Sequence, residues 1–350
     1  MARRCSIACI IPPVLLQELA RNGGEEERDA LLRTLSLDAS LRTARVHNSL
    51  VGAPSNRTTV LQSVTPGQPQ RTIYDCRGQE PTTTTPERVR GEGDPASDDD
   101  TVNEAYEGLG DTYAFYWDQF KRDSIDDQGM PLDGWVHYGR DYDNAFWDGE
   151  EMVFGDGKTF DRFTKSLDVI GHELTHGVTE KEAGLQYLNQ SGALNESVSD
   201  VFGVLVKQFK LGQTADKADW LIGADIVKSG FPGKALRSMT EPGTAWDGDD
   251  QPANMADYVQ TMADNGGVHT NSGIPNKAFA DLALKLGGHA WEKAGRVWYE
   301  TLRDPRVRAN ATFRQFAGRT LATTRRLYGS GGDEANAVAA CWKGVGVIVG

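Results

Sequence analysis

The pentapeptide His172-Glu173-Leu174-Thr175-His176 limits what this chain can fold into more than any other feature. Apolar residues lead into it and no proline interrupts it, so the spacing predicts an α-helix. Residues four apart lie on the same face of a helix, and His172 and His176 can therefore bind one metal ion. Glu173 lies beside them and can take a proton from a metal-bound water without being a ligand. The pattern predicts a zinc hydrolase, with two surface histidines on an amphipathic helix as the alternative.

Glu196 and Asp200 supply the carboxylates that such a site needs, and they are also four residues apart. If residues 192–200 form a second helix packed on the first, Glu196 completes a set of two histidines and one glutamate. An open fourth position then gives the catalytic rather than the structural zinc pattern. Asp200 suits the role of accepting the free ring N–H of a histidine ligand, which fixes its tautomer. A solvated helix carboxylate is the alternative for Glu196.

Several further motifs occur in a fixed order around these two segments. They are residues 142–149, 171–179, 184–187, 192–200, 236–239 and 264–273. From about Arg71 to the C-terminus, the chain resembles the thermolysin-type zinc metalloendopeptidases, and more closely their protealysin-type branch, which has a short propeptide. The resemblance implies an α+β fold of two lobes, one mixed β/α and one mainly helical, with the zinc helix between them. It implies a propeptide at 1–50 and lobes at 51–187 and 188–350.

The resemblance also implies a role for each residue of the site. His172, His176 and Glu196 bind zinc, and Glu173 activates the water that attacks the scissile carbonyl. The hydrogen-bond donors to the oxyanion that develops there are His269, which Asp264 orients, and Tyr187. Ordinary buried polar residues are the alternative for His269 and Tyr187.

Substrate binding is likewise inferred from the family. Asn144, the backbone of Ala145, and Arg237 hold the substrate in an extended pose, with a surface salt bridge as the alternative for Arg237. The first primed pocket has an apolar lining, formed by Phe160, Phe163, Val169, Ile222 and Leu236. We therefore expect cleavage on the amino side of large hydrophobic residues, with discrimination of about 1–3 kcal/mol per methylene.

One departure from the family concerns calcium. Thermolysin holds two calcium ions in an acidic cluster, of which Asp168 and Asp219 remain here. Lys207, Leu221 and Ala224 stand where carboxylates are required. Calcium needs about six to eight oxygen ligands, and an ammonium group would neutralise the same acids. We predict that the double calcium site is lost. The sequence does not decide whether the chain has any other calcium site.

The first fifty residues have a different character. Ile11-Pro12-Pro13-Val14-Leu15 resembles the propeptide stretch that blocks the active-site cleft of protealysin-like precursors. The two prolines pre-set an extended backbone, which suits a cleft built for strand-like substrates. Two short helical patterns follow, with leucines at 15, 16 and 19 and at 31, 32 and 35. We expect the chain's own propeptide to act as an intramolecular inhibitor and to end between residues 48 and 66.

The four cysteines do not form a disulfide framework. Cys5 and Cys9 lie just before the Pro-Pro stretch, and either could place a thiolate on zinc in the precursor; two simple thiols are the alternative. The sequence does not decide whether Cys76 and Cys341 form a disulfide.

Composition limits the partners. With a formal net charge of −13, of which residues 51–350 carry −14, the chain would be repelled by nucleic acid and by anionic membranes. No apolar run reaches the ~20 residues that a membrane span needs. The apolar run at 6–11 is too short for a secretory signal, so we expect export by a non-standard route, with the cytoplasm as the alternative.

The expected protein is a monomeric zinc endopeptidase that acts on polypeptides and matures itself from a zymogen. Two other functions stay open. One is a narrow-specificity effector protease, and the other is a non-catalytic binding module that keeps its zinc.

Overall fold

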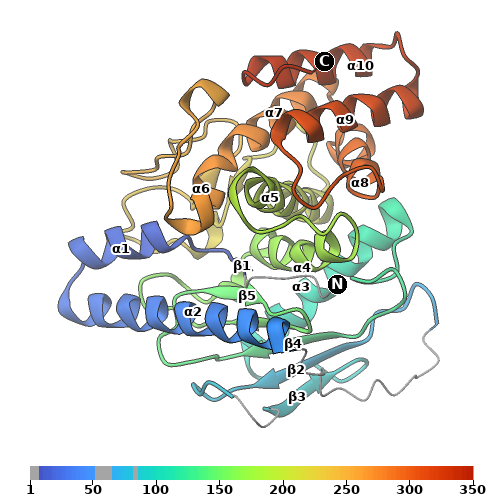
Figure 1. Ribbon diagram of the computed structural model, residues 1–350. Helices are drawn as coiled ribbons and strands as arrows, with labels where there is room; N and C mark the ends of the chain where they lie inside the picture. The colour runs from blue at the N-terminus through green and yellow to red at the C-terminus, as the bar shows by residue number, and fades with distance from the viewer. Residues whose placement is uncertain (1–7, 52–64, 82–85, 350) are drawn as a thin grey trace. The chain divides into compact units, whose positions relative to one another are not determined.

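A computed structural model describes residues 8–51, 65–81 and 86–349 (Figure 1). The chain forms two compact units, Met1–Lys165 and Ser166–Gly350. This division differs from the lobe boundary expected after Tyr187, because it assigns the helix of the His-Glu-x-x-His motif to the second unit. The α+β character is as predicted: the first unit combines a sheet with helices, and the second unit is mainly helical.

The first unit is built on a mixed six-stranded sheet with the order β1-β5-β6-β4-β2-β3. Its strands are β1 (Ala8–Cys9), β2 (Arg71–Asp75), β3 (Glu87–Gly91), β4 (Leu132–Val136), β5 (Ala145–Trp147) and β6 (Glu151–Phe154). β4 pairs in parallel with β2 and β6, and the other pairs are antiparallel. The threonine-rich residues 82–85 lie outside the described residues, and β3 begins just beyond them.

α3 (Asp100–Phe120) packs against β2 and β4. The Asp99 side chain caps it by accepting from the Thr101 N–H at 2.8 Å. Asp99 also accepts from His137 Nε2 at 2.9 Å, while the other ring nitrogen lies 2.9 Å from Asp156. This contact with Asp156, together with the field of both carboxylates, raises the pKa of His137 to about 9 against the effect of burial. A charged imidazole therefore links the start of α3 to the end of β4.

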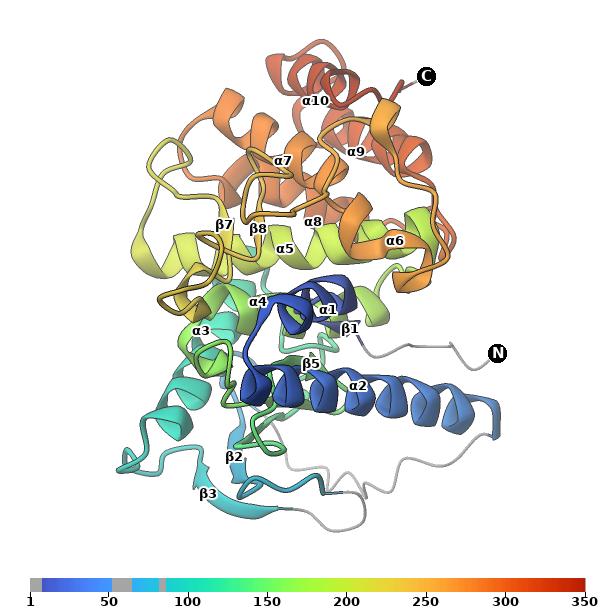
Figure 2. The same cartoon turned by 90° about the vertical axis from the view of Figure 1, so that its left-hand side faces the viewer.

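The N-terminal segment adds one strand and two helices to this unit. α1 (Pro13–Asn22) and α2 (Glu25–Val51) run side by side (Figure 2). α2 is longer than the short helix that the leucine pattern predicts, and it ends at Val51, within the range 48–66 in which the propeptide is expected to end. β1 pairs antiparallel with β5, with Cys9 opposite Phe146. An added strand of this kind satisfies the open backbone groups of a sheet edge.

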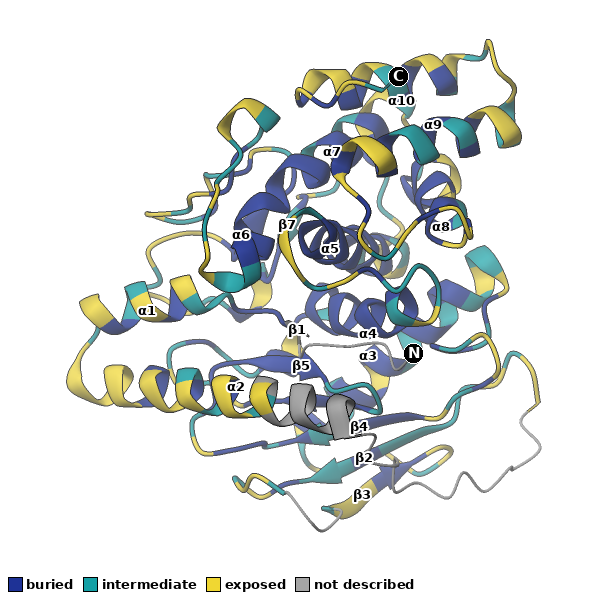
Figure 3. Ribbon diagram, viewed as in Figure 1, coloured by how far each residue is buried: buried dark blue, intermediate teal, exposed yellow. Residues whose placement is uncertain are grey.

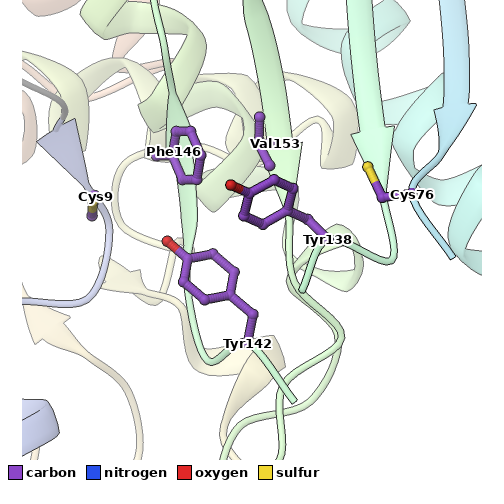
Figure 4. Close-up of a cluster of buried hydrophobic side chains, with 6 residues drawn as sticks. All are labelled: Cys9, Cys76, Tyr138, Tyr142, Phe146 and Val153. Atoms are coloured by element: carbon purple, nitrogen blue, oxygen red, sulfur yellow. The ribbon is translucent and has the colours of Figure 1, made fainter. Parts of the chain in front are cut away.

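A buried aromatic cluster fixes this segment to the sheet (Figure 4). Tyr138 packs edge-to-face on Tyr142 and Phe146, with ring centroids 5.5 and 5.7 Å apart. Cys9 belongs to the cluster, and Leu37 of α2 packs against it. The apolar surface removed from water here stabilises the docking of the N-terminal segment, since each fully buried large side chain contributes about 1.5–3 kcal/mol.

The second unit is assembled around two helices that are buried over most of their length (Figure 3). They are α4 (Leu167–Lys181) and α5 (Asn189–Leu211). A Cβ added to Gly203 would lie 2.4 Å from the Asp168 carbonyl oxygen, and one added to Gly171 would lie 3.2 Å from the Gly203 Cα. These two glycines therefore let the two helix backbones approach closely, which brings their polar side chains within reach of one another.

The remaining elements of the second unit surround this pair. They are β7 (Leu221–Ile222), β8 (Arg237–Ser238), α6 (Asp264–Asn271), α7 (Gly273–Leu286), α8 (Arg296–Leu302), α9 (Phe313–Tyr328) and α10 (Asp333–Gly344), with short helical turns η1 (Phe163–Lys165) in the first unit and η2 (Ala224–Ile226), η3 (Met255–Asp257) and η4 (Trp291–Gly295) in the second. No described helix combines the length and the apolar character that crossing a membrane requires.

Candidate active site

α4 and α5 bring His172, His176 and Glu196 together in the buried centre of the second unit. The Nε2 atoms of the two histidines lie 3.0 Å apart. The Glu196 carboxylate lies 3.5 Å from the first of them and 3.4 Å from the second. Glu173 is also fully buried, and its carboxylate and the two imidazoles lie close enough to share a cation. The i, i+4 spacing thus has the geometry that the sequence predicts.

The other ring nitrogen of each histidine is held by an oxygen. Asp200 Oδ1 lies 2.8 Å from His172 Nδ1, as predicted. Asn195 Oδ1 lies 2.8 Å from His176 Nδ1, and the Ser199 hydroxyl lies 3.0 Å from the same atom; neither residue was predicted from the sequence. A carboxylate and an amide oxygen accept hydrogen bonds, so both Nδ1 atoms carry the proton and both Nε2 atoms present a lone pair.

These lone pairs fit a zinc ion. Two bare nitrogens 3.0 Å apart repel one another unless a cation lies between them, and zinc bonds of about 2.0–2.1 Å place two nitrogens about 3.3 Å apart. Glu196 Oε2 is buried without a hydrogen-bond partner among the described residues, so it is available as a third ligand. Burial lowers the pKa of His176 to about 3, so its imidazole is neutral, which is the form that binds metal.

Tyr187 and His269 reach the same carboxylate. The Tyr187 hydroxyl donates to Glu196 Oε1 and lies 3.3 Å from His269 Nε2. Asp264 lies 2.9 Å from His269 Nδ1 and also accepts from the His269 backbone N–H. Burial alone would lower the pKa of His269, but the Asp264 and Glu196 carboxylates raise it to about 9. His269 is therefore a charged donor near neutral pH.

The turn that carries His269 depends on left-handed backbone at Asn265, Gly266 and Gly267. A Cβ on Gly266 would lie 2.1 Å from the Asn189 side-chain oxygen, so glycine is required there both for its φ of +89° and for space. The predicted motif at 264–273 thus supplies the donor and also the kink that places it.

Asp200 is a hub of buried hydrogen bonds. Besides His172, it accepts from Arg237 Nε at 2.9 Å and Nη2 at 2.7 Å, and from Asn276 at 2.8 Å. Burial would raise the pKa of Asp200, but Arg237 and His172 hold it well below its usual range. Arg237 is therefore part of a buried fork-to-carboxylate pair, which excludes the surface salt bridge considered from the sequence.

In the first unit, the N-terminal segment engages the predicted substrate edge. Asn144 Oδ1 accepts from the Ile11 N–H at 3.1 Å, and the Ala145 carbonyl accepts from the Ile10 N–H at 3.3 Å. The Asn144 amide group donates to Asp38 of α2 at 2.9 Å. Ile11 precedes the predicted inhibitory residues Pro12, Pro13, Val14 and Leu15, of which the last three begin α1.

Two further contacts from α2 reinforce this edge. Asp38 accepts from the Tyr142 hydroxyl at 2.6 Å, and the Thr34 hydroxyl accepts from the Asp143 N–H at 3.0 Å. Asp38 and Thr34 are both buried. The sequence did not indicate either of them, because a polar residue within an amphipathic helix carries no mark of its distant partner.

The five residues expected to line the first primed pocket are all buried. Phe160 and Phe163 are in the first unit, with ring centroids 6.1 Å apart. Val169, Ile222 and Leu236 are in the second, where the Leu236 N–H donates to the Ile222 carbonyl.

Lys207 lies among acids, as predicted. Its ammonium group lies 3.1 Å from the fully buried Asp168 and 3.4 Å from Asp219. Asp225, which was not predicted from the sequence, lies 3.6 Å away. Burial would lower the pKa of Lys207, but these carboxylates raise it above its ordinary value, so the side chain stays charged.

The cysteines form no disulfide within the described part of the chain. Cys76 and Cys341 are buried thiols, which excludes a bridge between them here, and burial raises the pKa of Cys76 to about 12 and that of Cys341 to about 11. Cys9 packs in the aromatic cluster. Cys5 lies outside the described residues.

Comparison with known proteins identifies the class. Residues 55–180 match the family "Thermolysin metallopeptidase, catalytic domain", and residues 183–347 match its α-helical domain. An "Extracellular metalloprotease" of Pectobacterium carotovorum subsp. carotovorum is 49% identical over 98% of this chain and 97% of its own length. "Protease PrtS" of Photorhabdus sp. (strain Az29) is 46% identical over 97% of this chain and 92% of its own.

Among solved structures, the precursor of protealysin, a metalloproteinase from Serratia proteamaculans, superposes with a TM-score of 0.87. It is 48% identical, and the match covers 97% of this chain and 99% of that one. The chain belongs to the thermolysin metallopeptidase family, in the protealysin-type branch, and is a zinc metalloendopeptidase.

Proposed function

We propose that His172, His176 and Glu196 hold the zinc and that Glu173 is the general base of peptide hydrolysis. The observation that carries this proposal is the convergence of two unprotonated imidazole nitrogens on one buried carboxylate. Zinc, when bound, lowers the pKa of a water ligand toward neutrality and polarises the substrate carbonyl. Glu173 takes the proton of the attacking water and passes it to the leaving amine.

Tyr187 and His269 donate hydrogen bonds to the developing oxyanion, with Asp264 holding His269 charged and in position. The Tyr187 hydroxyl must leave Glu196 to do so, and the 3.3 Å between its oxygen and His269 Nε2 supports a common target for the two donors. Asp200 fixes the tautomer of His172, and the Arg237 guanidinium keeps Asp200 ionised. Arg237 thus acts on the site through Asp200 as well as on the substrate backbone.

Substrate polypeptide takes the place of residues 8–11. These residues already pair with β5 and with Asn144, so an extended substrate that uses Asn144 and the Ala145 carbonyl would repeat their hydrogen bonds. Cleavage on the amino side of large hydrophobic residues follows from the apolar set of Phe160, Phe163, Val169, Ile222 and Leu236.

Residues 1–50 form an inhibitory propeptide, and residues 51–187 and 188–350 form the two lobes of the mature enzyme. The contacts of Ile11, Thr34 and Asp38 support the inhibition: Ile11 and Asp38 occupy the oxygen and the nitrogen of the Asn144 side-chain amide, and Thr34 accepts from the neighbouring Asp143 N–H. The match to a precursor over nearly its full length supports a zymogen as well. Cleavage lies between residues 48 and 66, a range that begins in the last turn of α2.

The double calcium site of thermolysin is replaced by the Lys207 ammonium group, which lies within 3.6 Å of Asp168, Asp219 and Asp225. The ammonium group occupies the space among these carboxylates and offers no oxygen ligand, so a calcium ion would have to displace it. The protein works as a monomer. It acts outside the cell, which accords with the name of the Pectobacterium relative.

The direct test is an intact-mass time course of the purified full-length chain beside its Glu173→Ala variant. We expect the unmodified chain to lose about its first fifty residues while the variant stays whole. If both stay whole, self-processing is wrong. If both are cut at the same rate, a contaminating protease is responsible, and Glu173 has no role in maturation.

A further inference from the structure

One segment of the second unit has a charge opposite to that of the chain. Residues 303–326 contain seven arginines and one aspartate, a net charge of +6, whereas the whole chain has a formal net charge of −13. Such an asymmetry indicates an anionic partner for this segment.

Four of these arginines line one cavity of about 1040 Å³, namely Arg306, Arg308, Arg314 and Arg319. Arg306 is neutralised by Asp304 through two hydrogen bonds of 2.8 Å. The other three make no ion pair with any described residue, although the chain contains 50 acidic residues. Three guanidinium groups on one concavity therefore remain available to carboxylates.

The cavity has an apolar floor, because the buried Val307 and Phe316 also line it. The backbone of the nearby helix start contributes little, since the N–H groups of Phe313 and Gln315 donate to Gln190 and to Thr312. The positive charge of the cavity thus comes from arginine side chains, and the floor suits apolar side chains of a peptide.

This cavity has neighbours beside the segment that carries Tyr187. It shares Ala311 and Thr312 with a smaller hollow of about 250 Å³, which is also lined by residues on both sides of Tyr187. That hollow in turn shares Asn189 and Tyr258 with a third of about 500 Å³. The cavity and the hollow of about 250 Å³, together called the groove, therefore lie side by side between the three arginines and the segment of Tyr187.

We propose that this groove is an exosite for polypeptide substrates, in which Arg308, Arg314 and Arg319 bind an acidic stretch outside the residues around the scissile bond. Guanidinium groups match carboxylates in a planar, two-pronged geometry. A polypeptide is favoured over a small oxyanion because the groove lies beside the segment of Tyr187 and has an apolar floor. The exosite rests on the proposed function, since it selects among substrates of that same active site.

The test uses fluorogenic peptides that share one cleavable hydrophobic core. A flexible spacer joins the core to a run of either glutamates or glutamines, placed on the amino side in one pair and on the carboxyl side in another. For one of the two sides, we expect the glutamate tail to raise kcat/KM roughly tenfold at low salt, because several exposed ion pairs act together. The gain lies in KM rather than kcat, and high salt removes it.

The triple variant Arg308→Gln, Arg314→Gln and Arg319→Gln should cleave the glutamate-tailed and glutamine-tailed peptides equally. Arg325→Gln is the matched control: Arg325 is on α9, as Arg314 and Arg319 are, also makes no ion pair with a described residue, and does not line the cavity. It should keep the full preference.

Equal cleavage of both tails by the unmodified chain would overturn the exosite, and so would a preference that survives in the triple variant. Tripolyphosphate that binds the unmodified chain but not the triple variant, without any tail preference, would assign the cavity to a small oxyanion instead. Failure to cleave even the untailed core would refute the proposed function, so the two failures are distinguishable.

Discussion

Replacing Lys207 tests whether an ammonium group has taken the place of calcium. Lys207→Met keeps most of the apolar stem but removes the charge. Asp168, which is fully buried, would then lose the ammonium group beside it and keep hydrogen bonds from the Ser166 hydroxyl at 2.6 Å and the Gly223 N–H at 3.2 Å. The variant therefore leaves a buried carboxylate with partial compensation.

The magnitude follows from these partners. Removing one member of a buried ion pair costs about 3–5 kcal/mol, and the two remaining hydrogen bonds reduce this to roughly 2–3 kcal/mol. Asp219 and Asp225 add little, because about half of each side chain is exposed. For a unit of this size, the loss corresponds to a fall in Tm of about 4–12 °C.

The assay is thermal unfolding of the Glu173→Ala chain, which prevents self-digestion, in buffer stripped of calcium and with zinc held constant. We expect Lys207→Met to unfold at a lower temperature and calcium to change neither it nor the parent. Lys207→Glu is the second variant to compare, since it places a fourth carboxylate beside Asp168, Asp219 and Asp225. It should be the least stable without calcium and should recover when calcium is added.

Two results would refute this reasoning. One is a parent chain whose Tm rises with calcium as much as that of Lys207→Glu, which would mean that the acids bind calcium beside the lysine. The other is a Lys207→Met variant within about 0.5 kcal/mol of the parent, which would place Lys207 among ordinary surface residues.

Three further predictions concern other parts of the molecule. His137→Gln should lower the free energy of unfolding in urea by about 1–2 kcal/mol at pH 6 and by little at pH 10. The pKa of His137 is raised to about 9 in the folded protein. Its stabilising contribution is therefore full below the unfolded pKa of about 6.5 and is lost as the pH rises through 9. An equal loss at both pH values would exclude the charged link. Asn195→Ala should weaken zinc binding about 10–100-fold in competition with a chromophoric chelator; unchanged affinity would show that Ser199 alone suffices. Asp38→Ala should speed loss of the propeptide relative to the exposed-site control Asp29→Ala, and equal rates would remove Asp38 from the inhibitory contact.

Local spacing accounts for much of the active site. The period of a helix is fixed by backbone geometry, so residues four apart in one sequence segment must share a face. His172 with His176, and Glu196 with Asp200, can therefore be paired from the sequence alone. The left-handed turn at 265–267 is local in the same way, because two successive glycines permit it.

The partners that complete the site were decided by packing. Asn195 precedes Glu196 and reaches His176 only because Gly171 and Gly203 let α4 and α5 approach closely. Asp38 and Asn144 are 106 residues apart, and nothing in either neighbourhood indicates the other.

The charged residues likewise divide into those that the sequence reveals and those whose contacts only the fold reveals. The sequence by itself determined that residues 303–326 are basic and predicted a zinc site on two helices, and the resemblance to thermolysin predicted that Lys207 stands where that family has an acid. Only the tertiary structure decided that three arginines line one groove beside the segment of Tyr187 and that Asp225 joins Asp168 around Lys207. The physical reason is that backbone periodicity acts over a few residues, whereas a contact between distant segments depends on how whole elements pack to bury apolar surface.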